Sequence, residues 1–539
     1  MERKDYLIDY LLPKKIVCAE NVLNSELLLQ EKSVQIGLSE PLYTIFKKGA
    51  YAVFDFGKEI AGGIRFLMWH CPADTRIRFR AGESVAEVMA DLGEHNSGND
   101  HALRDLTIPV SFLSDNELFS TGFRFLRIDI VEASADVFFK SVYAKFERRD
   151  LRRVGNFECS DSLMNKIYDT ACYTIELCMR DYIWDGIKRD RLVWIGDMYP
   201  EMRAVCSIFG QDKSVERSLD FVRDQTPLPG WMNAMPSYSL WWIIILHDYY
   251  LNTGNMTYLE TQKAYLSPLM RQIAESVNEQ GKIILSAYFL DWSIYEHEDA
   301  YAGVHFLAVT ALKKGSGLLT LLREDTGLIG SALVRLLQYE PVIGEKKQSV
   351  SVKHFSGEPL SVRDKAMIAQ GGAENISTFL SYFIFSGLFE TAGADYCYSV
   401  VNQYYGAMLD MGATTFWEDF NIKWIEGDVT RIDELPDGRK NIHRDFGAEC
   451  YKELRHSLCH GWSAGIVPFF TEAVLGIRIL EPGCKKISIT PRLGHLTYAR
   501  GEFPTPYGTI RLDIKKDKTG KLTVKHKIPK EISFVLNID

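Results

Sequence analysis

The sequence predicts a mainly helical, multidomain protein in which a toroid of two concentric helical rings lies between two antiparallel β-sandwiches. Three observations lead to this fold class. The chain has 539 residues, of which 46% are hydrophobic, and this is too long for one ordinary core. Apolar residues recur with a period of two at both ends of the chain and with helical spacing between them. Several of the helical segments are apolar around their whole circumference, as expected for helices that pack on more than one side.

The first domain, residues 1–150, is expected to be the N-terminal β-sandwich. Residues 76–80 and 126–130 alternate between apolar and polar side chains, which is typical of half-buried strands. Glycine-rich and polar turn clusters separate such runs at the spacing of a sandwich. Residues 85–105 interrupt the pattern with polar and flexible residues, so we expect them to form an excursion from the sandwich.

The second domain, residues 151–476, is expected to be the helical toroid. It begins behind a polar stretch at 159–162, after which Leu163, Ile167, Ala171 and Ile175 recur every fourth residue, as in a capped amphipathic helix. No fixed-period repeat of a helical array is present in the sequence. Further helices are predicted over 238–251, 267–279, 304–314, 376–389, 394–409 and 450–475.

The third domain, residues 477–539, is expected to be a small C-terminal β-sandwich. After Glu481-Pro482-Gly483 the apolar period returns to two. The stretches 504–508 and 517–520 are rich in proline, glycine and aspartate and supply turns between the strands.

The overall charge favours a neutral small-molecule substrate. Lys and Arg number 62 against 71 Asp and Glu, a formal charge of −9 spread along the chain, which argues against nucleic acid and an anionic membrane surface as partners. No apolar run approaches the roughly 20 residues of a membrane span, and the N-terminal stretch lacks a signal sequence. The ten scattered cysteines are interpreted as buried thiols of a reduced compartment, so we expect a cytoplasmic protein, with a homodimer left open.

Residues 184–201 are the most unusual stretch of the sequence. Four carboxylates, three basic residues and two tryptophans fall within eighteen positions, which is too polar for a core element and too aromatic for a solvated loop. The alternative is a surface segment whose opposite charges neutralise one another. A second stretch, 412–420, again sets acids beside aromatic residues, and two such stretches favour two walls of one polar pocket. Two further stretches, 289–293 and 455–462, have the same character.

Each of the two further stretches also has a purely structural interpretation. Asp291 and Trp292 could form a helix-terminal turn, and Arg455 and His456 could cap neighbouring helices, while His460 is open between the two roles. The pairs His297/Glu298 and His456/His460 suggest a metal site. No HExxH motif or third ligand accompanies either pair, so we expect neither a metal nor another cofactor. Walker A and dinucleotide fingerprints are absent from the sequence.

Acidic and aromatic loops gathered at one end of a helical toroid suit a sugar ligand. Aromatic rings stack on the apolar face of a pyranose, carboxylates bind its hydroxyls, and two opposed carboxyl groups suffice to hydrolyse a glycosidic bond. The same features also suit two other functions, a non-catalytic carbohydrate-binding protein on the same toroid and a polysaccharide lyase with a Tyr or His base.

The spacing of the acidic motifs resembles the bacterial α-L-rhamnosidase family, glycoside hydrolase family 78. The similarity lies in Asp185-x4-Asp190-x6-Asp197, Asp291-Trp292, Thr414-Thr415-x-Trp417-Glu418 and Ser457-x-x-His460, and in the order of the domains. The resemblance implies a six-hairpin (α/α)6 toroid and an inverting hydrolase that releases terminal α-L-rhamnose, or a related sugar, from glycosides or oligosaccharides. It also implies Asp190 as general acid and Glu418 as general base. The implied sugar-binding residues are Asp185, Arg189, Trp194, Asp197, Asp291, Trp292, Trp417 and His460.

The sequence departs from the family pattern at the acid. Many members carry Cys-Pro after the first aspartate and a glutamate as acid, where this chain has Gly186-Ile187 and Asp190. Glu201 is the alternative acid, because it lies four residues beyond Asp197 and on the same face if this stretch is helical.

Overall fold

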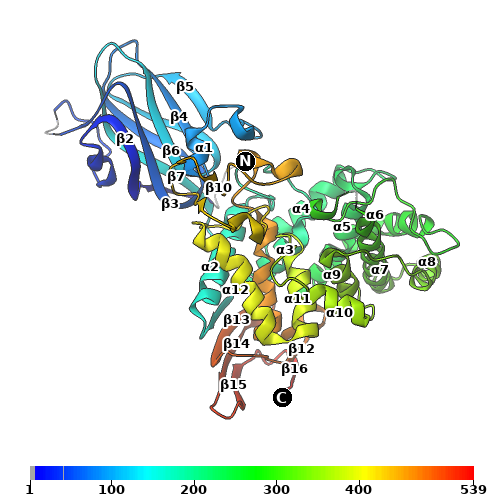
Figure 1. Ribbon diagram of the computed structural model, residues 1–539. Coiled ribbons are helices and arrows are strands. Elements are labelled where there is room, and N and C mark those ends of the chain that lie inside the picture. Colours follow the sequence, from blue (N-terminus) through cyan, green and yellow to red (C-terminus); the bar gives the residue numbers. More distant parts are fainter. Residues whose placement is uncertain (1–5, 40–41, 296, 539) are drawn as a thin grey trace.

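The computed structural model describes residues 6–39, 42–295 and 297–538 and combines helices with mainly antiparallel sheets (Figure 1). Contrary to the expectation of a wholly antiparallel C-terminal domain, strands 486–489 and 533–536 pair in parallel. The helices occupy the middle of the molecule. One large sheet, blue in Figure 1, lies at one end, and smaller sheets from the C-terminal part lie at another side. In the part of the chain that is described, no helix has both the length and the apolar character needed to cross a membrane.

The N-terminal region is a seven-stranded sheet. The strands run in the order β1-β7-β3-β6-β4-β5, with β2 paired to β3, and every pairing is antiparallel. The alternating runs predicted at 76–80 and 126–130 are confirmed as neighbours, because Ile77 pairs with Ile130 and Phe79 with Ile128. The strands are β1 (Tyr6–Leu11), β2 (Lys15–Leu23), β3 (Thr44–His70), β4 (Arg76–Gly82), β5 (Asp105–Pro109), β6 (Ser114–Glu132) and β7 (Val137–Arg149).

The predicted excursion at 85–105 is confirmed and joins the sheet to the helical region. It opens with the short helix α1 (Val85–Met89), which begins where the Ser84 side chain accepts a hydrogen bond from the Glu87 backbone N–H. Farther on, Asn96 Nδ2 donates to Glu453 Oε2 at 2.6 Å. The excursion therefore contacts chain that lies more than 350 residues away in sequence.

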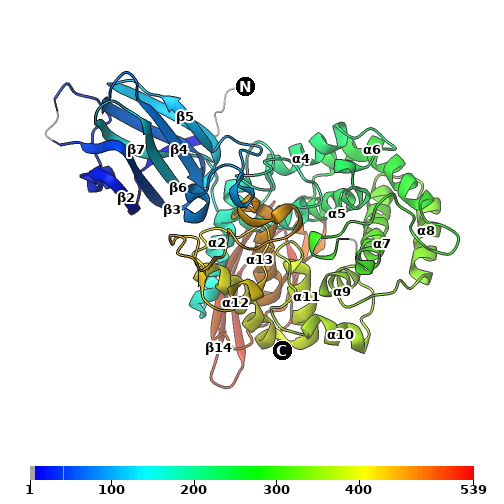
Figure 2. The same cartoon turned by 45° about the horizontal axis from the view of Figure 1, so that its top comes forward.

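The helical region follows the predicted pattern over most of its length. Asp161 caps α2 by accepting hydrogen bonds from the N–H groups of Leu163 and Met164, as the polar start predicts. In Figure 2, α4 to α10 follow one another around an arc. The helices are α2 (Ser162–Cys178), α3 (Met198–Ile208), α4 (Lys213–Asp224), α5 (Pro236–Thr253), α6 (Met256–Glu275), α7 (Glu298–Leu321), α8 (Gly327–Gln338), α9 (Lys347–Phe355), α10 (Val362–Ala369), α11 (Ser381–Ala392), α12 (Ala394–Asp410) and α13 (Ile466–Phe469).

Helix α5 shows why some segments are apolar on all sides. Its residues from Leu240 to Leu246 are all fully buried, so no face of this stretch meets solvent. Such a helix needs neighbours around its whole circumference. It packs against α3, α6 and α7, in agreement with the expectation from the sequence.

The expected helix over 450–475 is wrong for most of its length. The structure has isolated 3-10 turns at 449–451, 453–455 and 461–465, then the single-turn α13 and a π turn at 470–474. The backbone at 455–460 instead bonds to other segments; for example, the carbonyls of Arg455 and His456 accept from Arg189 and Lys188. The apolar residues of this stretch reflect its passage through the interior and not a helical face.

The C-terminal strands form a four-stranded and a three-stranded sheet. The first runs in the order β15-β14-β13-β8 and the second β11-β12-β16. β8 (Asn156–Cys159) lies in the range predicted for the helical domain but pairs with β13, so the chain enters the helices from the C-terminal sheet. The strands are β11 (Ile477–Glu481), β12 (Lys486–Ile489), β13 (Tyr498–Thr505), β14 (Gly508–Lys516), β15 (Leu522–Lys527) and β16 (Ser533–Leu536), and β9 (Val429–Thr430) and β10 (Lys440–Asn441) form a separate pair.

Candidate active site

Acidic residues from two distant stretches of the chain surround the ring of His460. His460 Nε2 lies 3.7 Å from Asp185 Oδ2, 3.7 Å from Glu418 Oε1 and 4.0 Å from Asp197 Oδ2. Burial, with a smaller effect of Arg189, lowers the pKa of His460 well below its usual value, so the imidazole is neutral. The predicted convergence of the 184–201 and 412–420 stretches is therefore present in the structure.

The loop from Asp185 to Leu192 is closed by its own aspartate. Asp185 accepts hydrogen bonds from the backbone N–H groups of Asp190 at 2.8 Å and Leu192 at 2.9 Å. Gly186 lies so close to the chain that a Cβ there would be 2.6 Å from the Arg189 carbonyl oxygen. A larger residue at this position would push the loop apart.

The carboxyl groups of Asp185 and Asp197 keep protons that exposed aspartates would lose. Burial, followed by the charge of Asp190, raises the pKa of Asp185 to about 7. Burial raises the pKa of Asp197 well above its usual value, and the Tyr238 hydroxyl donates to Asp197 Oδ1 at 2.9 Å. Near neutral pH these groups can therefore donate hydrogen bonds as well as accept them.

Glu418 is held rigidly at the site. Arg189 Nη2 donates to its two oxygens at 2.8 and 2.7 Å, and the Ser457 N–H donates to Oε2 at 3.0 Å. The Trp462 indole and the Thr378 hydroxyl donate to its backbone carbonyl. Burial raises the pKa of Glu418, and the charge of Arg189 opposes that shift.

Arg189 also links Glu418 to Asp190. Its Nη1 donates to Asp190 Oδ1 at 3.2 Å, and Trp194 Nε1 donates to Asp190 Oδ2 at 3.1 Å. The Asp190 side chain is 17% exposed, against 3% for Asp185 and 6% for Glu418. Two carboxyl groups thus lie on one guanidinium, and the Asp190 carboxyl is the one that solvent and a ligand can reach most easily.

Aromatic rings connect Trp292 to His460. Trp292 packs edge-on against Tyr451, with ring centroids 6.3 Å apart, and Tyr451 packs edge-on against Trp462 at 6.1 Å. The Trp462 and His460 rings lie 4.2 Å apart. The half-buried Trp292 therefore belongs to the same wall as the acidic cluster.

Asp291 combines a structural and an electrostatic feature. It caps the 3-10 turn at 292–294 through the Ser293 N–H, as the helix-terminal interpretation expects. Its other oxygen accepts from the Ser377 hydroxyl, and burial raises its pKa. The carboxyl is placed on the chain immediately before Trp292 and the aromatic wall.

Trp417 and Trp194 have different environments. Trp417 is 1% exposed and packs edge-on against Phe420 and His456, so its ring lies in the interior behind Glu418 and not with the other predicted ligands. Trp194 is half-buried, packs edge-on against Tyr238 and bonds to Asp190. Trp194 is thus brought to the acidic cluster, whereas Trp417 supports it from behind.

Glu201 lies beneath the site on α3. It is fully buried, and its Oε1 has no hydrogen-bond partner among the described residues. Gly461 covers it so closely that a Cβ there would be 2.2 Å from this oxygen. Burial raises the pKa of Glu201 well above its usual value, which makes it a neutral carboxyl with less access to a ligand than Asp190.

Sequence reasoning missed four side chains of the site: His101, Tyr238, Tyr451 and Trp462. Trp462 falls in the stretch 455–462 that the sequence singled out, next to the predicted His460. Tyr238 lies on α5, in a stretch where apolar character hid its hydroxyl. Nothing in the local sequence marks His101, whose Nε2 lies 3.1 Å from Asp190 Oδ1.

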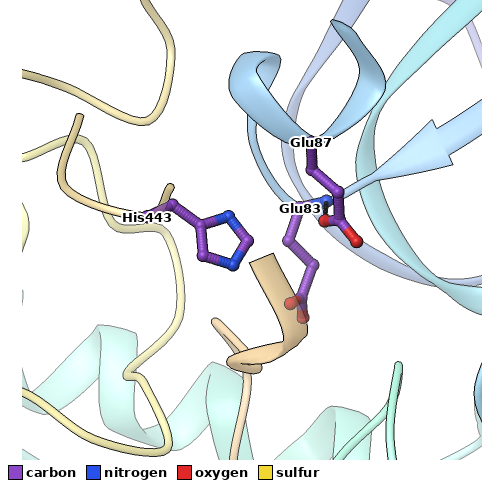
Figure 3. Close-up of side chains that lie close together, drawn as sticks. All are labelled: Glu83, Glu87 and His443. Atoms are coloured by element: carbon purple, nitrogen blue, oxygen red, sulfur yellow. Dashed lines mark hydrogen bonds between the residues drawn. The ribbon is translucent and has the colours of Figure 1, made fainter. Parts of the chain in front are cut away.

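Glu83, Glu87 and His443 form a buried group with the composition of a metal site (Figure 3). The ammonium of Lys188 lies 3.0 Å from Glu83 Oε2 and 3.4 Å from Glu87 Oε1, in the position a cation would take. His443 Nε2 donates to the His456 carbonyl, and its Nδ1 lies 2.7 Å from Ser84 Oγ. The donor set is therefore already satisfied by protein groups and fits a structural ion cluster better than a metal.

The His297 and His456 pairs are used structurally as well. His297 Nδ1 accepts from the Asp299 N–H at 3.1 Å, and His456 Nε2 accepts from the Asp419 N–H at 2.9 Å. These bonds take up the lone pairs that a metal would need.

Comparisons with known proteins identify two domains in the chain. Residues 152–309 match the bacterial alpha-L-rhamnosidase 6 hairpin glycosidase domain, and residues 476–538 match the bacterial alpha-L-rhamnosidase C-terminal domain. An alpha-L-rhamnosidase from Formosa agariphila is 22% identical over 487 residues, which cover 77% of this chain and 47% of that protein. The chain thus spans about half the length of that curated relative.

Solved structures share the fold. The GH78 family rhamnosidase of Bacillus sp. GL1 has a TM-score of 0.73 at 22% identity, covering 90% of this chain and 53% of that one. The rhamnosidase from Klebsiella oxytoca, solved with rhamnose bound, has a TM-score of 0.66 at 18% identity, covering 86% of this chain and 95% of that one. Residues 152–309 and 476–538 are thus similar to two domains of the bacterial alpha-L-rhamnosidases, and the chain shares the fold of these solved structures.

Proposed function

We propose that this protein is a glycoside hydrolase that releases terminal α-L-rhamnose, or a related sugar, from glycosides or short oligosaccharides with inversion at the anomeric carbon. The observation that carries the proposal is the pair of carboxyl groups, Asp190 and Glu418, on the guanidinium of Arg189. Two carboxyl groups on either side of a glycosidic bond are the minimum that such hydrolysis requires. The matched rhamnosidase domain and the rhamnose-bound relative favour rhamnose as the sugar.

Asp190 is the proposed general acid. It is the most exposed of the clustered carboxyl groups, and its two oxygens are oriented by Trp194 and Arg189. In the reaction its proton passes to the glycosidic oxygen as the bond to the anomeric carbon breaks. The departing alcohol thereby leaves as a neutral molecule.

Glu418 is the proposed general base. As an ionised carboxylate it takes a proton from a water molecule, whose oxygen forms the new bond to the anomeric carbon from the opposite face. Inversion requires room for this water, with the two carboxyl groups separated by about 6.5–9.5 Å. Burial raises the pKa of Glu418, which strengthens it as a base, and the charge of Arg189 favours its ionised form.

The remaining acids and aromatic residues are proposed to bind the sugar. Asp185, Asp197 and Asp291 are buried carboxyl groups with raised pKa values, which suit hydrogen bonds to hydroxyl groups. The half-buried Trp292 offers a ring to the apolar face of a pyranose. Neither a cofactor nor another macromolecule is needed for this chemistry, and the architecture that we propose around it is the double helical ring between two β-sandwiches.

A screen of aryl glycosides tests the proposal. Wild-type protein should release the aryl alcohol from an α-L-rhamnoside, and the matched variant Glu418→Gln should not, although it keeps the shape of the side chain. An unsaturated sugar product would identify a lyase. Binding of rhamnose without release from any glycoside in the screen would favour the non-catalytic alternative.

A further inference from the structure

The excursion from the N-terminal sheet contributes to the site through residues 91–105, which we call the 91–105 segment. Two contacts attach it to the helical region: Asn96 to Glu453, and Asp100 Oδ2 to Arg455 Nε at 2.9 Å. The carbonyl of Arg455 in turn accepts from Arg189 Nε at 3.1 Å. The segment is thus tied to the same loop that orients the guanidinium between Asp190 and Glu418.

His101 is the residue of this segment that meets the proposed acid. Its Nε2 lies 3.1 Å from Asp190 Oδ1, and its side chain is 35% exposed. Its backbone has φ of 59°, a left-handed conformation that residues with a Cβ seldom adopt. Such a conformation persists where the surroundings hold it, as the Asp100 contact does here.

The three groups around the Asp190 carboxyl differ in what they can do with a proton. The Arg189 guanidinium and the Trp194 indole only donate hydrogen bonds, because neither has a lone pair to accept a proton. An imidazole can both give and accept one. His101 is therefore the partner, among the three, with which Asp190 can exchange a proton.

We propose that His101 and Asp190 form an acid pair, in which His101 shares the catalytic proton and returns one to Asp190 after each turnover. This inference rests on the proposed function and adds to its general acid a residue from another part of the chain. Because His101 is partly exposed while Glu418 is buried, His101 also gives the acid a route to solvent.

The proton balance of the pair is simple. Asp190 transfers its proton to the leaving oxygen and becomes a carboxylate, while Glu418 gains a proton from the attacking water. The neutral His101 ring then takes a proton from solvent and, as an imidazolium, gives its Nε2 proton to Asp190. Glu418 loses its extra proton as product leaves, so the site returns to its starting state.

The charges that face the pair come from three segments. The carboxylates are Asp190 and Asp100, and the guanidinium groups are Arg189 and Arg455. The two guanidinium groups are each paired with one of these carboxylates. Arg189 is also shared with Glu418, so an imidazolium at His101 faces an excess of carboxyl groups and not an excess of positive charge.

Kinetics on two substrates test the pair. We compare wild type, His101→Gln and His101→Ala on 4-nitrophenyl α-L-rhamnoside, which hardly needs an acid, and on methyl α-L-rhamnoside, which does. General acid catalysis is worth about 10²–10⁴-fold, and loss of the partner should remove about tenfold or more of kcat/KM on the methyl glycoside. The nitrophenyl glycoside should lose less than about threefold, since its leaving group needs little protonation.

The pH profile separates proton exchange from positioning. If His101 exchanges protons with Asp190, loss of the imidazole should change the position of the alkaline limb of kcat/KM in both variants. Glutamine can still donate a hydrogen bond to Asp190, so full activity and an unchanged profile in His101→Gln would overturn the inference. Added imidazole should partly restore His101→Ala on the methyl glycoside.

A matched control lies in the same segment. Asn96→Ala removes an anchor of the 91–105 segment without touching Asp190, and it should keep the wild-type alkaline limb. Equal losses on both substrates in the His101 variants would show a structural role and overturn the pair. If wild type hydrolyses the rhamnosides and the His101 variants are unaffected, the acid pair is wrong but the proposed function stands. If wild type is inactive, the proposed function itself is wrong.

Discussion

Lys188 and Arg189 are adjacent in sequence but serve two opposite electrostatic environments. Lys188 points to the sheet domain, where Glu83 and Glu87 meet Lys188 and Arg104, two acids with two bases. Arg189 points to the site, where its one guanidinium pairs with both Glu418 and Asp190, while Asp185 and Asp197 lie beside a neutral His460. Both environments are buried, so burial alone does not mark a functional site. The functional site is instead marked by an excess of carboxyl groups over cations.

The largest expected effect comes from replacing one glutamate by glutamine in each of the two environments and comparing kcat. Glu418→Gln should lower kcat by about 10²–10⁴-fold with little change in sugar binding, because it deletes the base and keeps the shape. Glu87→Gln, in the balanced cluster, should leave kcat of the folded protein near the wild-type value. Steady-state kinetics and rhamnose binding measure both, and a loss of only a few-fold in Glu418→Gln would remove Glu418 as the base.

The second test concerns the acid. Asp190→Asn should slow a natural glycoside by about 10²–10⁴-fold and an activated aryl glycoside very little. Glu201→Gln, the comparison variant, should show no such dependence on the leaving group, because Glu201 is buried beneath Gly461. If the effect of Glu201→Gln depends on the leaving group and Asp190→Asn slows both substrates alike, Glu201 is the general acid and Asp190 is not.

The balanced cluster should matter for stability. Lys188→Met leaves Glu83 and Glu87 without their ammonium partner, and breaking a buried pair in this way typically costs about 3–5 kcal/mol of the free energy of unfolding. The double variant Lys188→Met/Glu83→Gln should recover part of that loss, because one uncompensated charge is removed. Denaturant unfolding of the three proteins measures the effect, and a cost below about 1 kcal/mol would mean that the cluster is not a structural ion pair.

The smallest expected effect is the pH dependence of Asp185→Asn. The asparagine loses one acceptor for the N–H groups of Asp190 and Leu192, at a cost of about 1–3 kcal/mol. Burial raises the pKa of Asp185 from its ordinary 3.8 to about 7 in the folded protein. Between these values the folded state binds the proton and the unfolded state does not, so wild-type stability falls as pH rises and levels off above pH 7.

Asparagine does not titrate, so the cost of Asp185→Asn should be larger at pH 5 than at pH 8. Unfolding at both pH values, with wild type measured in parallel, checks the sign. An equal cost at the two pH values would show that the Asp185 carboxyl is not protonated in the folded state.

Local patterns predicted much of the fold because they depend on neighbours in sequence. The alternating strands at 76–80 and 126–130 and the Asp161 cap of α2 follow from side-chain spacing within a few residues. The expected helix at 450–475 failed because burial in an irregular crossing gives the same apolar composition as a helix. Composition cannot distinguish the two.

The residues of the site show the same difference between local sequence patterns and long-range contacts. The acidic and aromatic stretches, together with the family resemblance, indicated Asp185, Asp197, Glu418 and His460, and the structure brings these four together. His101 could not be predicted, because its place is set by the path of the 91–105 segment across to the helical region and by contacts with Asp190 and Arg455 that lie far away in sequence.

The central claim is that an unbalanced pair of carboxyl groups, Asp190 and Glu418, hydrolyses an α-L-rhamnoside by direct displacement with water. Proton NMR of the first-formed sugar from an aryl α-L-rhamnoside tests it most directly. The inverting mechanism predicts β-L-rhamnose as the initial product, followed by slow mutarotation to the α-anomer. Initial release of α-L-rhamnose would require a covalent intermediate and a carboxylate pair only about 5–5.5 Å apart, and would contradict the account.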